Sequence, residues 1–230
     1  GACDMGGLPN VFSGYQSVAD PAAREKFEKA WGVKLPAEPG LTLTEFIHDA
    51  YERKIKAIYL MGENIALSEP CVKMCQGALE ELDFLVVQDL YLTESAKLAH
   101  VVLPACSFAE KDGTYTNTER RVQRVRAALE PMGQSQPDWT IVCQLAKRMG
   151  GKGFDYQNPQ EIMKEIAQLT PSYGGISYER LDKEGGLQWP CPTADHPGTP
   201  RLHVDKFTRG KGKFSPLEYR PPAELPDAEY

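Results

Sequence analysis

The sequence predicts an α/β protein: half of a doubly wound, mainly parallel three-layer αβα sheet domain, followed by a smaller mixed α+β, loop-rich segment. Apolar runs at 55–61, 84–87 and 101–103 each stop at glycine, polar residues or proline, as buried parallel strands do where a site follows their carboxyl ends. Helix-compatible segments separate the runs, so each connection is expected to be a crossover. We place the boundary between the two parts at 107/108, giving 1–107 and 108–230.

Helix signals support the crossovers. Asp20 and Pro21 provide a cap and a first-turn proline, and Thr42 with Glu45 forms a capping box. The 84–87 run is apolar at every position, which favours a strand buried on both faces. The helices expected in this part cover 20–31, 42–54 and 68–82, with a short crossover at 93–99.

The second part begins with alternating residues at 110–125, which predict an edge strand or hairpin. Asp138 is expected to cap a helix, and Asn158 with Pro159 begins another. After Pro171 the pattern breaks into short pieces, and from Trp189 onward it is typical of an extended tail that packs on something else. The buried stripe of the helix from Asp138 is expected to comprise Ile141, Val142, Leu145 and Met149.

Composition narrows the functional classes. The chain has 230 residues, 41% hydrophobic content and a net charge of -6. An acidic chain is not expected to bind nucleic acid. No apolar run approaches the roughly 18 residues of a membrane span, and no signal peptide opens the sequence. We therefore expect a soluble, cytoplasmic protein.

Several reactive residue types have simple structural interpretations. Cys71 and Cys75 lie one helical turn apart, but no second ligand pair stands nearby, so small buried thiols are favoured over a metal site. His48 is expected on the surface or in packing. The basic cluster could meet phosphates, although ion pairs on a solvated face are the more usual outcome. This cluster comprises Arg120, Arg121, Arg124 and Arg126.

Polar residues at the predicted strand ends indicate a ligand-binding rim. Asp89 follows the central run and could accept hydrogen bonds from a base edge or from sugar hydroxyls. The sequence has neither a Gly-x-Gly-x-x-Gly motif nor a phosphate-binding loop. The alternative, that these polar groups only cap strand-to-helix turns, stays open.

Two longer motifs carry a family resemblance. TESAKLAHVVLP at 93–104 and EKDGTYTNTERRVQ at 110–123 together resemble the molybdopterin oxidoreductase family of molybdenum and tungsten enzymes. Within that family the chain is most similar to the catalytic (alpha) subunits of formate dehydrogenases, of which it looks like an internal third. The finer resemblance rests on GACDMGGLP at 1–9, Gln88-Asp89, Asp138-Trp139 and Gln188 to Cys191.

The resemblance implies which residues hold the guanosine part of a molybdopterin guanine dinucleotide. Relatives commonly have proline where this chain has Ile65, which puts the turn presenting Asn64 in doubt. Relatives often have serine where this chain has Ala105, so only the backbone of that residue could contribute. The implied cofactor-binding residues are Glu63, Asn64, Ser68, Gln88, Asp89, Ala105 and Asp138.

The resemblance also implies parts that this chain does not supply. Full-length relatives carry two such dinucleotides with molybdenum or tungsten and a 4Fe-4S cluster, and they oxidise formate to CO2. No cysteine here matches a metal or cluster ligand, so we expect no catalytic or metal-binding residue, and no activity of the isolated chain. The expected partners are the rest of the subunit and electron-transfer subunits. The alternatives are a sibling such as nitrate reductase, or a noncatalytic scaffold.

Overall fold

The computed structural model describes residues 1–205, 207 and 210–222. The chain divides into a first compact unit, Gly1–Thr199, and a second that begins at Pro200. The described residues of the second unit contain no helix. Among all described residues, no helix has the length and apolar character needed to span a membrane.

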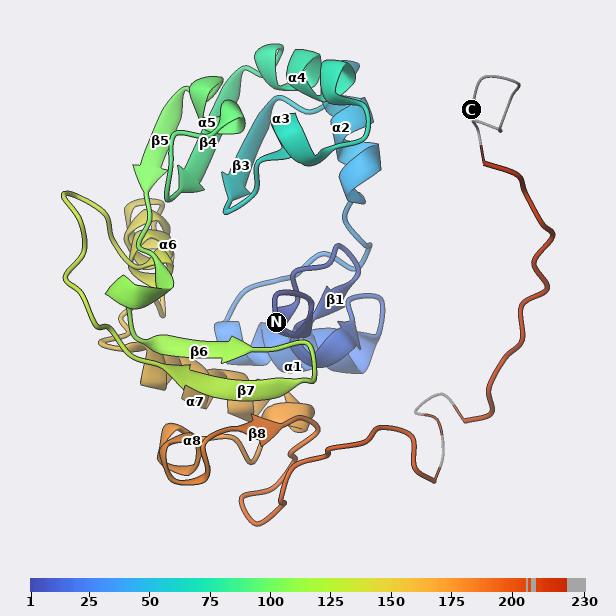
Figure 1. Cartoon of the computed structure of the whole chain (residues 1–230), viewed down its shortest axis with the longest axis vertical. Coiled ribbons are helices and arrows are strands. Elements are labelled where there is room, and N and C mark those ends of the chain that lie inside the picture. The colour runs from blue at the N-terminus through green and yellow to red at the C-terminus, as the bar shows by residue number, and fades with distance from the viewer. Residues whose placement is uncertain (206, 208–209, 223–230) are drawn as a thin grey trace, which may run out of the picture. The chain divides into compact units, whose positions relative to one another are not determined.

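A parallel three-stranded sheet confirms the predicted α/β class. Its strands are β3 (Ala57–Met61), β4 (Phe84–Asp89) and β5 (Val101–Pro104), in the order β3-β4-β5. The register pairs Gln88 with Met61 on one side and with Leu103 on the other. The three arrows in Figure 1 point the same way, so the carboxyl ends of all three strands meet at one edge.

Helices pack on one face of this sheet. They are α2 (Leu43–Tyr51), α3 (Ile65–Ser68), α4 (Val72–Glu80) and α5 (Glu94–Lys97). Their apolar side chains form a core with Leu60 of β3 and with Leu85 and Val87 of β4, and the last two are fully buried. Phe84, which points to the opposite face, is 47% exposed. The prediction that β4 is buried on both faces is therefore wrong at its start, while Gln88 at its other end is buried on the same face as Phe84.

The predicted helix at 68–82 is split. Ser68 ends α3 and does not begin the next helix, which starts at Val72. Glu69, between them, is extended (φ -78°, ψ 142°). It precedes Pro70, whose ring disfavours helical geometry in the residue before it. The capping box of Thr42 and Glu45 is present as predicted, with the Thr42 amide donating to Glu45 at 2.7 Å.

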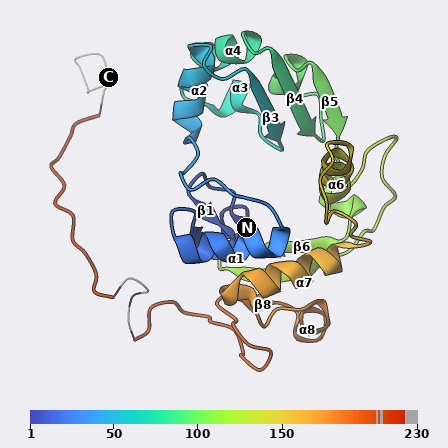
Figure 2. The same cartoon turned by 180° about the vertical axis from the view of Figure 1, so that it is seen from behind.

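The amino-terminal residues pack with the second half of the first unit. They form η1 (Cys3–Met5), β1 (Val11–Phe12), η2 (Ser13–Tyr15), β2 (Gln16–Ser17) and α1 (Pro21–Trp31). Asp20 caps α1 as predicted, accepting from the amide of Ala22 at 3.0 Å. Helix α1 runs beside α7 (Pro159–Leu169) in Figures 1 and 2, and Trp31 donates its indole N–H to Glu165 at 2.9 Å.

A second, antiparallel sheet follows the first. After η3 (Phe108–Glu110) the hairpin forms as β6 (Gly113–Thr116) and β7 (Arg121–Val125), and β8 (Leu187–Gln188) joins the far side of β7. Its core includes Leu187 and Cys191, so the tail predicted from Trp189 begins too early. This core also uses α7, η4 (Pro171–Tyr173) and α8 (Tyr178–Glu184). The predicted boundary at 107/108 falls between the two cores and stays a prediction.

Helix α6 (Asp138–Arg148) corrects two expectations. Pro137 occupies the N-cap position, and the Asp138 side chain makes no capping bond because its carboxylate is engaged elsewhere. Of the predicted stripe only Ile141 is buried, together with the unpredicted Cys143. Met149 is 79% exposed. The helical period was right, but the direction of the inner face was set by tertiary packing.

Candidate functional site

Gln88 and Asp138 form the centre of the strand-end rim. Gln88, near the end of β4, is 0% exposed, and its amide N–H donates to a carboxylate oxygen (Oδ1) of Asp138 at 2.7 Å. The amide oxygen accepts from the hydroxyl of Tyr59 on β3, and the Lys111 ammonium pairs with Oδ2 of Asp138. Two predicted residues, 50 positions apart in the chain, are thus directly bonded.

Asn64 fixes a second part of the rim. It follows β3, and its side-chain oxygen accepts from both the amide (3.0 Å) and the hydroxyl (2.9 Å) of Ser95. Its side-chain nitrogen donates to Glu94 at 2.7 Å, a bond that lowers the pKa of that glutamate. The start of α5 therefore holds both ends of the Asn64 amide, with Ile65 as the next residue.

Each of the remaining predicted residues keeps at least one polar atom without a partner within the described chain. Glu63 and Ser68 are exposed, and neither side chain has a hydrogen-bond partner within the described chain. Asp89 is half-buried and accepts from the Leu90 amide at 2.6 Å through Oδ1. Ala105 is buried, and its amide donates to the Asp89 carbonyl at 3.0 Å, which leaves only its carbonyl to contribute.

Sequence reasoning missed four residues of this rim: Tyr59, Glu94, Ser95 and Lys111. Ser95 is fully buried, and its hydroxyl also accepts from the Ala66 amide at 3.0 Å. Its position inside the cap of α5 was a usable signal, since polar groups at a helix start often bond neighbouring loops. Lys111 carried no signal, because a lone lysine in a loop is usually solvated.

The rim offers mainly acceptor groups. The Glu63 carboxylate and the Ser68 hydroxyl have no partner within the described chain, and Asp89 keeps one carboxylate oxygen, Oδ2, without one. The Asp138 side chain is 34% exposed. Carboxylates bind N–H groups and sugar hydroxyls and repel phosphates. The arrangement therefore suits the nucleoside end of a ligand better than its phosphates.

A second polar centre lies at the amino-terminal loop. Asp4, 6% exposed, accepts from the Tyr15 hydroxyl at 2.8 Å, the Trp189 indole at 3.1 Å and the Tyr173 hydroxyl at 3.3 Å. Burial, followed by the bond to Asp4, raises the pKa of Tyr15 to about 12. The loop at residues 3–5 is thereby tied to η2, η4 and the segment after β8, a structural role that the sequence did not reveal.

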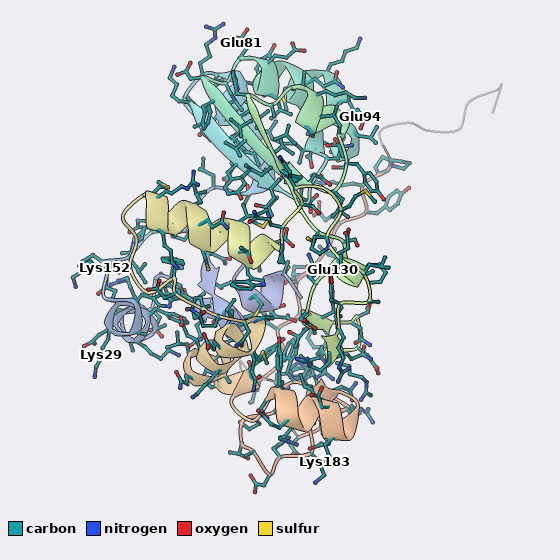
Figure 3. The ribbon with its side chains drawn as sticks, turned by 90° about the vertical axis from the view of Figure 1, so that its left-hand side faces the viewer. Lys29, Glu81, Glu94, Glu130, Lys152 and Lys183 are labelled. Atoms are coloured by element: carbon teal, nitrogen blue, oxygen red, sulfur yellow. The ribbon has the colours of Figure 1, made fainter. Side chains whose placement is uncertain are left out.

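The arginines of the cluster at 120–126 bond other groups of the same chain, including the expected ion pairs. Arg121 pairs with Glu119 at 2.8 Å, and Arg124 stacks over the Tyr178 ring at 3.6 Å. Arg120 instead donates to the Trp189 and Thr199 carbonyls, and so fixes the end of the first unit. The exposed surface carries charges of both signs, as the outward Glu81 after α4 and Lys183 of α8 show (Figure 3).

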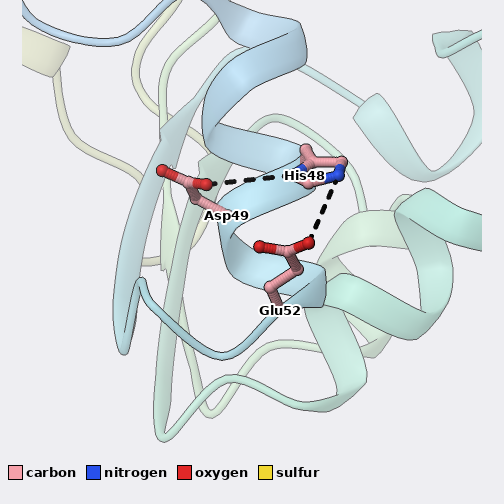
Figure 4. A group of neighbouring side chains, drawn as sticks. All are labelled: His48, Asp49 and Glu52. Atoms are coloured by element: carbon pink, nitrogen blue, oxygen red, sulfur yellow. Dashed lines mark ion pairs between the residues drawn. The ribbon is translucent and has the colours of Figure 1, made fainter.

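One group of metal-ligand residues occurs among the described side chains, at the end of α2 (Figure 4). His48 faces Asp49 through Nδ1 (3.8 Å) and Glu52 through Nε2 (3.5 Å), which are opposite sides of its ring. Lys54 bonds both carboxylates, at 3.3 and 2.6 Å, and chiefly through this bond lowers the pKa of Glu52. The group is thus a largely exposed ion-pair network in which Lys54 already bonds both carboxylates.

Of the two cysteines one helical turn apart, only Cys75 is the small buried thiol that the sequence predicted. Cys75 is buried and donates to the Ile65 carbonyl at 3.2 Å, and burial raises the pKa of its thiol to about 11. Cys71, one turn earlier, is exposed. Their different surroundings do not make a shared metal site.

Comparisons with known proteins agree with this architecture. The sequence model of the molybdopterin oxidoreductase family matches residues 1–148. The chain is 53% identical to the F420-dependent formate dehydrogenase subunit alpha of Methanocaldococcus jannaschii and 50% identical to that of formate dehydrogenase 2 of Methanococcus maripaludis. Both matches cover 100% of this chain and 34% of the relative, so the chain spans about a third of their length.

A solved structure shares the fold. Acetylene hydratase from Pelobacter acetylenicus aligns with a TM-score of 0.52 and 22% identity, over 74% of this chain and 24% of that one. The parallel sheet, whose strands span residues 57–104, lies within the stretch 1–148 that the family model matches. The chain therefore belongs to the molybdopterin oxidoreductase family.

Proposed function

We propose that this chain holds the guanosine end of a molybdopterin guanine dinucleotide within the catalytic subunit of a formate dehydrogenase. The carrying observation is the rim at the carboxyl edge of the parallel sheet, where free carboxylates stand beside the buried Gln88–Asp138 bond. Ligands of α/β sheets bind at this edge. The names of the relatives support the enzyme class.

The residues divide into contacts and supports. Glu63, Asp89 and Ser68 would receive sugar hydroxyls or base N–H groups. The side chains of Glu63 and Ser68 have no partner within the described chain, and Asp89 keeps its Oδ2 while Oδ1 accepts from Leu90. Asn64 and Gln88 would support them, because the amides of both are fully engaged by neighbouring groups.

Asp138 and Ala105 complete the proposed site. The exposed third of the Asp138 side chain would accept from guanine N–H groups, and Ala105 would offer its carbonyl. The cofactor, when bound, supplies dithiolene sulfurs that hold molybdenum or tungsten. In this proposal residues 1–107 form the nucleotide-holding part, and 108–230 pack on the rest of the subunit.

The complete enzyme in this proposal oxidises formate to CO2 and passes on two electrons. The metal ligands and the 4Fe-4S cluster belong to other parts of the subunit, so the isolated chain would be inactive. The names of the relatives make coenzyme F420 the first electron acceptor to test. Electron-transfer subunits would then be its partners, and we propose the cytoplasm as its location.

The test compares two aspartates at opposite ends of β4 in the full-length subunit. Asp89 lies at the carboxyl end of β4, and Asp83 precedes the other end, with an exposed side chain. Asp89→Asn keeps an acceptor for the Leu90 amide but removes the charge. We expect purified Asp89→Asn to contain less guanine nucleotide per protomer, measured after acid hydrolysis, while Asp83→Asn matches the wild type. Equal content in all three would refute the proposed rim.

A further inference from the structure

We propose that Lys111 is a positioning residue of the dinucleotide site, which acts by holding the Asp138 carboxylate against Gln88. This inference rests on the proposed function, because the effect of Lys111 is measured as the tightness with which the dinucleotide is held. Lys111 lies in the loop between η3 and β6 and has a side chain only 19% exposed. Its ammonium takes Oδ2 of Asp138, while the Gln88 amide takes Oδ1.

Both carboxylate oxygens are therefore fixed, one by each partner. Asp138 is the first residue of α6, a position from which a free carboxylate tends to turn toward the amides of its own helix. Here the Asp138 carboxylate instead bonds Gln88 and Lys111, and it accepts from no amide of α6. Lys111 opposes the turn from one side and Gln88 from the other, so the exposed part of the carboxylate keeps one direction.

The loop that carries Lys111 is itself anchored. The neighbouring Glu110 accepts from the amides of Ser107 at 2.8 Å and Met132 at 2.9 Å. Lys111 and Asp138 also share the wall of a mainly apolar cavity of about 260 Å³ with Trp139. An ion pair set beside apolar side chains is screened less than a surface pair, and removing one partner leaves the other uncompensated.

The hydrogen bonds that link Tyr59, Gln88 and Asp138 form a chain in which each group donates to the next. Tyr59 donates to the oxygen of the Gln88 amide, and the nitrogen of that amide donates to Asp138. If the Gln88 amide flipped, its oxygen would face the Asp138 carboxylate that Lys111 holds. Asp89 follows Gln88 directly in β4, so a fixed Gln88 also fixes the strand end that presents Asp89.

A double-mutant cycle in the cofactor-loaded full-length subunit tests the proposal. The variants are Lys111→Met, Lys111→Arg, Asp138→Asn and the double variant Lys111→Met/Asp138→Asn. Lys73→Met, at an exposed position of α4, is the control. The readout is the rate at which protein-bound guanine nucleotide is lost during incubation. We expect Lys111→Met to speed the loss about tenfold, as removal of a charge-assisted bond does. Lys111→Arg should stay within about threefold of the wild type, because it retains the cation.

The double variant decides how Lys111 acts. If Lys111 works through Asp138, Lys111→Met adds nothing in the Asp138→Asn background. The same tenfold effect in both backgrounds, or no effect of Lys111→Met beside a clear effect of Asp138→Asn, would overturn this inference and leave the proposed function standing. Failure of both Asp138→Asn and Asp89→Asn to change nucleotide retention would overturn both.

Discussion

Replacing Gln88 with leucine tests the frame of the rim directly. The residue is fully buried on β4, and its amide joins the Tyr59 hydroxyl to the Asp138 carboxylate. Leucine has a similar volume and no polar atoms, so Gln88→Leu removes both bonds without opening a large cavity. The groups left behind are a carboxylate with Lys111 still attached and a tyrosine hydroxyl.

The size of the effect follows from the two lost bonds. The 2.7 Å bond to the Asp138 carboxylate is charge-assisted and is worth about 1.5–3 kcal/mol. The bond from Tyr59 adds about 0.5–1.5 kcal/mol. The Asp138 side chain is 34% exposed, so water recovers part of this loss. We expect the free energy of unfolding to fall by about 1–3 kcal/mol, which lowers Tm by a few degrees for a chain of this size.

Urea unfolding followed by circular dichroism measures the change. Gln144→Leu is the matched control, since exposed Gln144 of α6 bonds only Gln136, at 3.0 Å. Its substitution should change the free energy of unfolding by less than about 0.5 kcal/mol. A Gln88→Leu variant as stable as the wild type, or a control equally destabilised, would refute the claim that Gln88 organises the rim.

Three further predictions follow from the same contacts. In the native chain at mildly alkaline pH, a maleimide should label Cys71 well before Cys75, whose pKa is raised to about 11, and mass spectrometry after partial labelling checks the order. Tyr15 has its pKa raised to about 12, so the stability that it contributes is present below pH of about 10 and is lost as pH rises toward 12. Asp4→Asn should lower the pH at which Tyr15 titrates in an ultraviolet titration, and an unchanged titration would contradict the Asp4 bond. Asn158→Ala, which removes the cap that accepts from an amide at 3.1 Å, should cost about 1 kcal/mol in thermal unfolding, and no change would mean that the cap is dispensable.

Local signals in the sequence were sufficient for most elements. The apolar runs ending near Met61, Asp89 and Pro104 located three parallel strands, and the caps at Asp20 and Thr42 located two helices. These predictions succeed because strand length and helix capping are decided by residues that are neighbours in the sequence. The split at Pro70 was available in the sequence too, but the apolar spacing of the helix outweighed it.

Local sequence patterns could not predict contacts between residues that lie far apart in the chain. Asp138 has the residue type and position of a cap, yet Gln88, 50 residues earlier, and Lys111 take both its oxygens. The inner face of α6 likewise depends on what packs beside it. For the site, the family motifs selected Gln88 and Asp89, which lie at the carboxyl end of β4. Sequence alone did not separate residues whose amides are fully engaged, such as Asn64, from those with unpartnered polar atoms.

The most direct test of the central claim is an experimental structure of the full-length subunit with its cofactor bound. The account predicts density for a guanosine at the carboxyl edge of the β3-β4-β5 sheet, with its sugar or base within hydrogen-bond distance of Asp89 and of Asp138. The Gln88–Asp138 bond should persist beneath it. A guanosine bound elsewhere, with this edge covered by protein side chains, would contradict the account.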